Sequence, residues 1–264
     1  MKQNRLLLIL GLAILTGLAS CKTNRYIYKS SKPNVPFFGE KGDADASASI
    51  GASGVDVQGA YAISDHFAVT GAASLGIGEE QDEEKSIRDS VATVNYHRND
   101  FEIGVGYFVT LNPSKTITFN LYAGGGIGQF KIDEAENNTS YNRNFKVNTS
   151  RFYLQPSFNF MPGRYFRFSV YFKPIYLKYG DISTSYTAEE KEYFGFDFIQ
   201  DKALLYGEFG YDLQVKIPGV SWLYLEQTLS ITPWQDDLIG STRLYNQSVN
   251  ATVGLSVRLD QLNL

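Results

Sequence analysis

The chain has 264 residues, with 24 basic and 28 acidic side chains and a net charge of −4. This balance argues against a nucleic-acid-binding protein, because phosphate contacts need a surplus of Lys and Arg. The single cysteine excludes a disulfide framework, and the length fits one large domain. The 18 Tyr, 18 Phe and 24 Gly favour a fold made of strands.

The first 20 residues have the features of a bacterial signal peptide. Lys2 and Arg5 form a basic start, and the apolar run over residues 6–15 is too short for a stable transmembrane helix. Leu18-Ala19-Ser20-Cys21 follows and resembles a lipobox, in which the cysteine is acylated and the chain is cleaved in front of it. We therefore expect a lipoprotein that carries palmitate or a similar acyl group on Cys21. An ordinary secretory peptide with a nearby cysteine is the alternative.

The residues after Cys21 predict a leader in front of the first strand. Lys22 and Thr23 stand where an Asp would retain a lipoprotein in the inner membrane, so we expect the outer membrane. Cleavage before Cys21 leaves 22 basic and 28 acidic side chains, a net charge of −6. We expect three parts: a signal peptide over residues 1–20, a lipid-tethered leader along the periplasmic surface over 21–43, and one domain over 44–264.

Two short motifs carry a family resemblance. Val35-Pro36-Phe37-Phe38-Gly39-Glu40-Lys41-Gly42-Asp43 and Val57-Gln58-Gly59-Ala60-Tyr61 resemble the opening of small outer-membrane β-barrel lipoproteins of the Bacteroidota, most of which are uncharacterised. The resemblance implies a fold and a location, and it carries over no catalytic residue. Surface-exported lipoproteins of that phylum tend to have acidic residues just after the cysteine. None stands here, so we expect an inner-leaflet anchor.

Apolar and polar side chains alternate with a period of two over four long segments, at about 116–131, 165–179, 205–216 and 249–258. In the second segment, for example, Phe166, Phe168, Val170 and Phe172 share one face, whereas Arg167 and Lys173 lie on the other. The same alternation occurs more weakly at 44–53, 55–63, 67–77, 100–111, 149–161 and 220–232, which brings the total to ten predicted strands.

The connections between these strands favour a membrane barrel. Short turns at 64–66, 112–115, 162–164 and 218–219 alternate with long loops at 78–99, 133–148, 180–201 and 233–242, and only the hairpin at Ser53-Gly54 departs from the pattern. Bacterial membrane barrels have short periplasmic turns and longer external loops. We predict an all-β, antiparallel, up-and-down transmembrane barrel of about ten strands. The even strand number predicts that both termini are periplasmic.

The polar face of the predicted strands would line a narrow lumen. It includes a set of charged residues of both signs: Asp56, Glu102, Arg167, Lys173, Glu208, Asp212, Lys216, Glu226 and Arg258. Buried charges need partners, so we expect a paired network that plugs the lumen. A small polar pore is the alternative, although ten strands enclose little space.

Three other features could indicate catalysis, metal binding or covalent modification. His97 lies near Asp100 and Glu102, which could orient its imidazole in an outer-membrane hydrolase, but no nucleophile motif accompanies it. The acidic run at 79–84 could bind divalent cations, although it lacks the spacing of an EF-hand and fits a solvated loop. Ser90, within Asp89-Ser90-Val91, resembles an O-glycosylation site of the Bacteroidota. We expect no catalytic residue, metal site or cofactor.

These observations lead to one main hypothesis and two alternatives. The first is a non-enzymatic, lipid-anchored outer-membrane barrel with a structural or surface-interaction role, surrounded by membrane lipid and lipopolysaccharide. A small pore or ligand-transport barrel is the second. The third is a soluble, lipid-tethered periplasmic barrel that binds a hydrophobic ligand and turns its apolar stripes inward. The sequence identifies neither a partner nor an oligomeric state.

Overall fold

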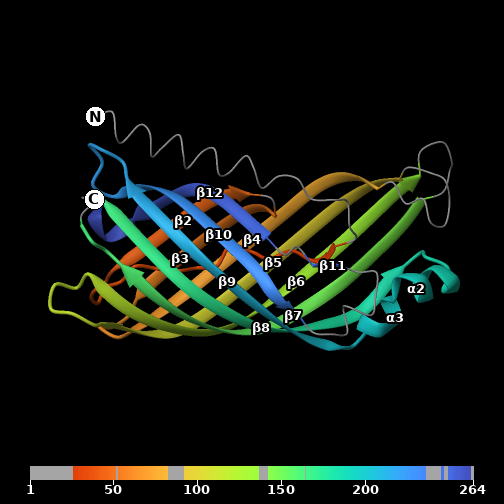
Figure 1. Cartoon of the computed structure of the whole chain (residues 1–264), viewed down its shortest axis with the longest axis horizontal. Coiled ribbons are helices and arrows are strands. Elements are labelled where there is room, and N and C mark those ends of the chain that lie inside the picture. The colour runs from red at the N-terminus through yellow and green to blue at the C-terminus, as the bar shows by residue number, and fades with distance from the viewer. Residues whose placement is uncertain are drawn as a thin grey trace.

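Ten antiparallel strands close into a barrel (Figure 1), as the turn pattern predicts. The computed structural model describes residues 26–262, apart from 52, 83–91, 137–141, 164, 236–244 and 247–248. Around the barrel the strands follow the order β10, β12, β2, β3, β4, β5, β6, β7, β8 and β9, and β9 pairs with β10. The last strand, β12, pairs with the first barrel strand, β2, so the ring has no open edge.

The elements have the following bounds: β1 Tyr26–Tyr28, β2 Ala44–Gly51, β3 Gly54–Ala62, β4 Phe67–Asp82, β5 Ala92–Thr110, β6 Ile117–Glu136, β7 Asn142–Phe160, β8 Phe166–Thr184, α2 Ala188–Phe194, α3 Phe196–Ile199, β9 Ala203–Lys216, β10 Leu223–Gln235, β11 Tyr245–Asn246, β12 Val249–Arg258 and the 3₁₀ turn η1 Leu259–Gln261. The two short strands β1 and β11 pair with each other in parallel and form a separate sheet that is not hydrogen-bonded into the barrel wall.

All four predicted short turns lie at one end of the barrel, here called the short-turn end. The opposite end, the long-loop end, differs from the prediction. Much of the predicted loops at 78–99 and 133–148 is strand, because β4 continues to Asp82 and β7 already begins at Asn142. The predicted loop at 180–201 contains the end of β8 and both helices, α2 and α3, which the sequence analysis did not predict.

In the part of the barrel next to the short turns, here called the membrane half, apolar side chains face outward. Phe166, Phe168 and Val170 of β8 are 47%, 36% and 38% exposed, whereas Arg167 and Lys173 on the opposite face are 7% and 1% exposed. A soluble barrel would have the reverse arrangement. The structure therefore contradicts the soluble periplasmic alternative and has the inside-out pattern of a membrane-spanning barrel.

Beyond the membrane half, β4 to β8 continue into a projecting half in which the two faces exchange character. On β5, Val94 and Tyr96 point inward and are buried, whereas His97 and Asn99 are exposed on the outer face. The change falls next to the pair of Asn99 and Gln129, since the outward pair Phe101 and Ile127 follows directly. From this boundary to the start of β6 at Ile117, the apolar belt fits the ~9–11 residues with which a tilted strand crosses a bilayer.

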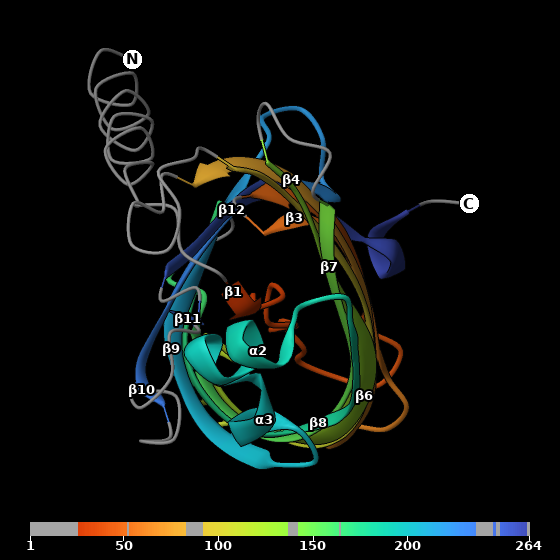
Figure 2. The same cartoon turned by 90° about the vertical axis from the view of Figure 1, so that its right-hand side faces the viewer.

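The inward residues of the projecting half form an apolar core. It combines residues of β1, the barrel wall and the helices: Ile27, Tyr28, Val94, Tyr96, Phe130, Ile132, Phe145, Val147, Ile175, Leu177, Tyr179, Tyr186, Phe194, Phe196, Ile199, Leu204 and Tyr206. Helices α2 and α3 lie across the mouth of the barrel (Figure 2), where Phe196 stacks on Phe145 with ring centroids 4.6 Å apart. No helix in the described part of the chain is both long and apolar enough to cross a membrane.

Candidate functional site

The lumen of the barrel is filled by the chain's own N-terminal region. Residues 27–38, here called the lumen segment, are buried with the exception of Asn34, which is half-buried, and β1 lies inside the ring of strands (Figure 2). The expectation that this leader follows the periplasmic surface is therefore wrong for residues 27–38. The physical reason is that the inward face of the barrel is polar and needs partners, which the backbone, Lys and Ser groups of the segment provide.

At the long-loop end, the lumen segment contacts Glu208 of β9. Tyr28 Oη and Ser30 Oγ donate hydrogen bonds to Glu208 Oε1, at 2.9 and 2.5 Å. Arg98 Nη1 donates to the carbonyl oxygens of Lys29 and Ser30, at 2.7 and 2.9 Å. The ring of Tyr28 also stacks on Tyr206, with centroids 4.9 Å apart. Both the side chains and the backbone of the segment are thus held by the wall.

Halfway along the lumen, Lys32 is the main charged contact of the segment. Its side chain is 1% exposed, and its ammonium forms an ion pair with Glu226 and donates to Ser47 Oγ at 2.9 Å. Gln58 donates to the carbonyl of Lys32, while the Lys32 backbone N–H donates to Asp56 at 3.3 Å. A buried ammonium with a carboxylate and further hydrogen bonds is the arrangement in which a charge can be accommodated away from water.

Near the short-turn end, amide and guanidinium groups bind the backbone of the segment. Asn120 and Asn159 donate to the carbonyl of Pro36 at 3.2 and 2.8 Å, and Arg258 donates to the carbonyl of Phe37 at 2.5 Å. Phe38 packs against Phe108 in a small apolar cluster. The two phenylalanines and their apolar neighbours thus occupy this end of the lumen.

The wall itself carries an ion-pair network around Glu102. Lys173 Nζ and Arg151 Nη1 lie 2.9 and 3.2 Å from the two oxygens of Glu102. Arg151 also pairs with Asp100, and Arg98 Nε lies 2.9 Å from the same carboxylate. Ser31 of the lumen segment donates to Glu102 at 3.4 Å, which links the wall network to the segment.

Glycines of β6 make room for this network. A Cβ on Gly124 would lie 2.5 Å from Tyr153 Oη, and a Cβ on Gly126 would lie 2.8 Å from Glu102 Cγ and 3.3 Å from Arg151 Nε. Side chains at these two inward positions would therefore displace large groups that contribute to the lumen. The absence of side chains at Gly124 and Gly126 therefore leaves room for Tyr153, Glu102 and Arg151 on the inner face.

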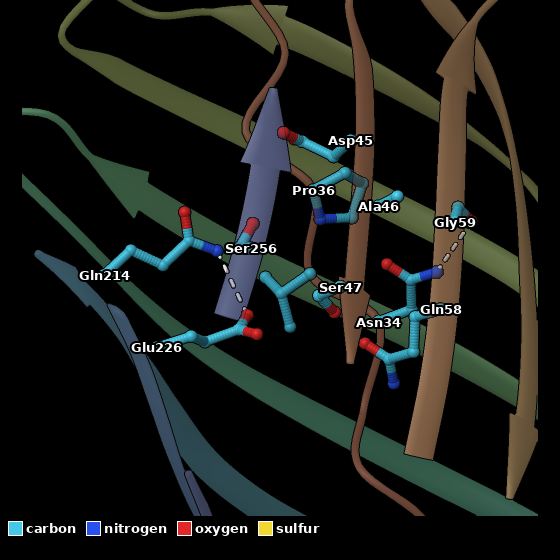
Figure 3. A pocket seen from close by; sticks show the side chains of 11 residues that line it. Asn34, Pro36, Asp45, Ala46, Ser47, Gln58, Gly59, Gln214, Glu226 and Ser256 are labelled. Atoms are coloured by element: carbon cyan, nitrogen blue, oxygen red, sulfur yellow. Dashed lines mark hydrogen bonds between the residues drawn. The ribbon is translucent and has the colours of Figure 1, made fainter. Parts of the chain in front are cut away.

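A recess beside the lumen segment, lined among others by Asn34, Pro36, Gln214 and Glu226 (Figure 3), has a volume of about 10 Å³. Such a volume holds about one water molecule. At one side of the recess, Gln214 of β9 donates to its cross-strand partner Glu226 of β10 at 3.1 Å.

The nine predicted lumen residues lie on the inner face, where Glu102 and Lys173 pair with each other and most of the others contact residues outside the predicted set, as Glu226 does with Lys32. Eight are buried: Asp56, Glu102, Arg167, Lys173, Glu208, Asp212, Glu226 and Arg258. Lys216 is half-buried near the short-turn end, 5.8 Å from the ring of Tyr224. Asp212 accepts a hydrogen bond from Thr228 at 2.8 Å, and the Arg167 guanidinium lies 4.2 Å from the ring of Tyr224.

Sequence reasoning missed several charged residues of the lumen, among them Lys29, Lys32, Asp45, Arg98, Asp100 and Arg151. Arg98 lies within the predicted loop at 78–99, where no inward face was assigned, and Lys32 lies in the predicted leader. Asp100 was considered only as a partner of His97. The alternation of β7 does predict that Arg151 points inward, because Phe152 and Leu154 are apolar and face outward.

The other candidate groups do not assemble into a reactive site. His97 faces outward, with Nε2 3.9 Å from Asp133, whereas Asp100 and Glu102 belong to the inner face, so the proposed orientation of its imidazole by these two carboxylates is wrong. In the acidic run at 79–84, only the backbone of Glu79 to Asp82 is described, as part of β4, and Ser90 lies outside the described residues. Among the described residues, no group of three or more His, Cys, Asp or Glu could hold a metal ion.

Ion pairs also hold the chain at the short-turn end, where it leaves the lumen. Lys115 Nζ lies 2.8 Å from Glu40, and this hydrogen bond raises the pKa of the exposed Lys115 ammonium. Arg258 lies 2.9 Å from Asp43 and donates to Asp260 at 2.8 and 3.1 Å. Burial opposes ionisation of Asp260, but the contacts with Arg258 outweigh it and lower the pKa of this carboxyl. The chain is thus held on both sides where it leaves the lumen.

Together, fold and lumen define a membrane-spanning, ten-stranded β-barrel that is filled by its own N-terminal region. No protein-family model matches the chain, and no curated protein matches its sequence. Among solved structures, it is similar to the outer membrane protease OmpT from Escherichia coli, with 10% identity, a TM-score of 0.47, and coverage of 83% of this chain and 94% of the protease. A likeness at this level carries over no residue and no activity.

Proposed function

We propose that this chain is a closed, non-enzymatic barrel of the bacterial outer membrane, lipid-anchored at Cys21, which presents its projecting half at the cell surface as a structural or interaction element. The observation that carries this proposal is the occupied lumen. Lys32, Ser30 and Tyr28 bind wall carboxylates, and Phe37 and Phe38 lie at the short-turn end. A barrel filled in this way offers no open path to a solute.

The location is supported by the fold and by the sequence start. Closed barrels with short turns at one end and long connections at the other are typical of bacterial outer membranes. The apolar belt supplies the surface that faces lipid, and the polar outer face of the projecting half suits the headgroup region and the lipopolysaccharide above it. The Leu18 to Cys21 motif supports the lipid anchor.

Planar-bilayer recording of the purified full chain tests the closed lumen. We expect no discrete channel openings under conditions in which a general porin, recorded in parallel, conducts. Regular openings of the full chain would favour the small pore instead. A variant that lacks residues 27–38, checked for folding by circular dichroism and heat-modifiable electrophoretic mobility, should conduct if it folds.

Metabolic labelling with an alkyne-tagged palmitate tests the anchor. We expect label on the wild-type chain and none on Cys21→Ala. Ser20→Ala is the matched control, because it keeps a small residue before the cysteine and should leave labelling unchanged. Equal labelling of Cys21→Ala and the wild type would contradict acylation at this position.

A further inference from the structure

The lumen segment runs lengthwise through the barrel and has a clear direction. At its start, β1 pairs with β11, which belongs to the connection between β10 and β12 at the long-loop end. At its end, Phe38 contacts Phe108, and Glu40 pairs with Lys115 in the short turn between β5 and β6. The chain therefore passes from the long-loop end to the short-turn end before β2 begins. The expectation that the chain in front of β2 stays at the short-turn end is wrong for residues 26–38.

A closed barrel leaves this segment only its two mouths as exits. Neighbouring strands are hydrogen-bonded around the whole ring, including the pairs β12 with β2 and β9 with β10. Contacts of the segment reach opposite walls, since Asn120 of β6 donates to the carbonyl of Pro36 and Arg258 of β12 donates to the carbonyl of Phe37. At Tyr26, its first described residue, the segment accordingly lies at the long-loop mouth.

The level of Tyr28 relative to the apolar belt sets how far the preceding chain can reach. Tyr28 stacks on Tyr206, and the neighbouring outward residues Leu205 and Tyr176 form a cross-strand pair at the outer edge of the belt. Tyr28 lies seven positions after Cys21, and a fully extended chain of that length spans about 25 Å at most. The hydrocarbon core of a bilayer is about 30 Å thick. Cys21 cannot reach the opposite leaflet from there.

We infer that the chain enters the barrel from the cell exterior, so that the acyl group on Cys21 is held in the outer leaflet of the membrane. This inference rests on the proposed outer-membrane location and lipidation, and it replaces the inner-leaflet anchor expected from the sequence. The rim of the barrel favours such an anchor. The β2–β3 hairpin ends level with Leu75 and its partner Asn99, at the belt boundary, whereas β4 to β8 continue past it. An exit on the side of β10, β12, β2 and β3 therefore lies next to lipid.

Cysteine labelling of intact cells tests this topology. With Cys21 blocked by its lipid, one added cysteine is the only free thiol of the chain. We compare Asn24→Cys with two matched positions, Glu192→Cys on the exposed face of α2 and Ser114→Cys in the exposed turn between β5 and β6. A membrane-impermeant maleimide is applied before and after the outer membrane is permeabilised.

The expected result is full labelling of Asn24→Cys and Glu192→Cys in intact cells, and labelling of Ser114→Cys only after permeabilisation. If Asn24→Cys follows Ser114→Cys while Glu192→Cys is labelled in intact cells, the inference is wrong and the spanning barrel stands. If Glu192→Cys and Ser114→Cys behave alike, the spanning barrel itself is wrong. The two failures are therefore distinguishable.

Discussion

On β5 of the membrane half, Val105 faces outward and Glu102 inward, whereas on the same strand in the projecting half His97 faces outward and Tyr96 inward. The backbone and its pairing with β6 continue unchanged through this boundary. Only the side of the apolar residues changes, and it follows the change from a lipid to a water environment outside the wall. One continuous barrel is therefore inside-out in one half and has the ordinary arrangement of a soluble protein in the other.

Different parts of the lumen segment contact the two halves of the barrel, and each part has the polarity of the interior that it contacts. Ile27 and Tyr28 join the apolar core of the projecting half, and the run from Lys29 to Lys32 satisfies polar groups of the membrane half. In the projecting half the interior is stabilised by the hydrophobic effect. In the membrane half it depends on ion pairs and hydrogen bonds that have little water to replace them. The two halves should thus respond differently to the same kind of substitution.

The largest difference is expected for lysines on the two faces of β8. Lys173→Ala removes a buried partner of Glu102 and should lower the free energy of unfolding by about 3–5 kcal/mol, because it leaves a carboxylate without its closest cation. Lys178→Ala, on the exposed outer face of the projecting half, should change it by less than about 0.5 kcal/mol. Urea unfolding of both variants in detergent micelles measures the effect. Equal losses would show that the membrane half does not depend on its ion network.

A second comparison introduces the same charge at two heights on the outer face of β5. Val105→Arg puts a cation into the apolar belt and should cost about 2–4 kcal/mol in a bilayer. Asn99→Arg, at the belt boundary, should cost less than about 1 kcal/mol. Unfolding of the two variants in lipid vesicles measures the difference. A similar cost at both positions would mean that the belt does not face lipid.

The membrane half was readable from the sequence because its alternation has a single phase over each strand. On β8, Phe166 to Phe172 and Arg167 to Lys173 keep their sides, and the short turns fixed where each strand begins. The projecting half was not readable in the same way. On β5 the apolar positions change from odd numbers, as at Phe101, to even numbers, as at Tyr96, and a segment without a single period predicts a loop.

The occupant of the lumen could not be read from the sequence for a different reason. Residues 27–38 have no periodic pattern, and their partners, such as Glu208 and Asn159, lie more than a hundred residues away along the chain. The charges of both signs on the inner face did predict a plug of paired groups. The leader supplies part of this plug through contacts between residues that are far apart in the sequence, and no local pattern predicts such contacts.

A third prediction concerns the cap over the projecting half. Gly195 links α2 to α3 with a φ of 78°, a conformation that is strained by about 1–2 kcal/mol for an L-residue with a side chain. Gly195→Ala should therefore lower the free energy of unfolding by about 1 kcal/mol. Gly163→Ala, in a short turn with negative φ and open space around it, should be close to neutral. Urea unfolding followed by tryptophan fluorescence compares the two, and equal effects would remove the special role of the α2–α3 link.

The smallest expected effect is a pH dependence at the short-turn end, where the lumen segment leaves the barrel. Because Arg258 lowers the pKa of Asp260 in the folded chain, this carboxylate stabilises the fold above its ordinary pKa of about 3.9 and loses that effect as the pH falls through the folded value. Asp260→Asn should lower the free energy of unfolding at pH 7 by less than about 1 kcal/mol, since the Asp260 side chain is still 21% exposed and solvent screens its contact with Arg258.

The gap between the wild type and Asp260→Asn should then narrow as the pH falls below about 4, where the unfolded chain becomes protonated first, and close below the lowered pKa of the folded chain. Unfolding titrations from pH 7 to pH 3 measure it, with Asp181→Asn, at an exposed position of the projecting half, as the matched control for the loss of one carboxylate. A gap that stays constant over this range would mean that Asp260 acts through its shape or neutral hydrogen bonds. The contact with Arg258 would then add no charge-dependent stability where the segment leaves the lumen.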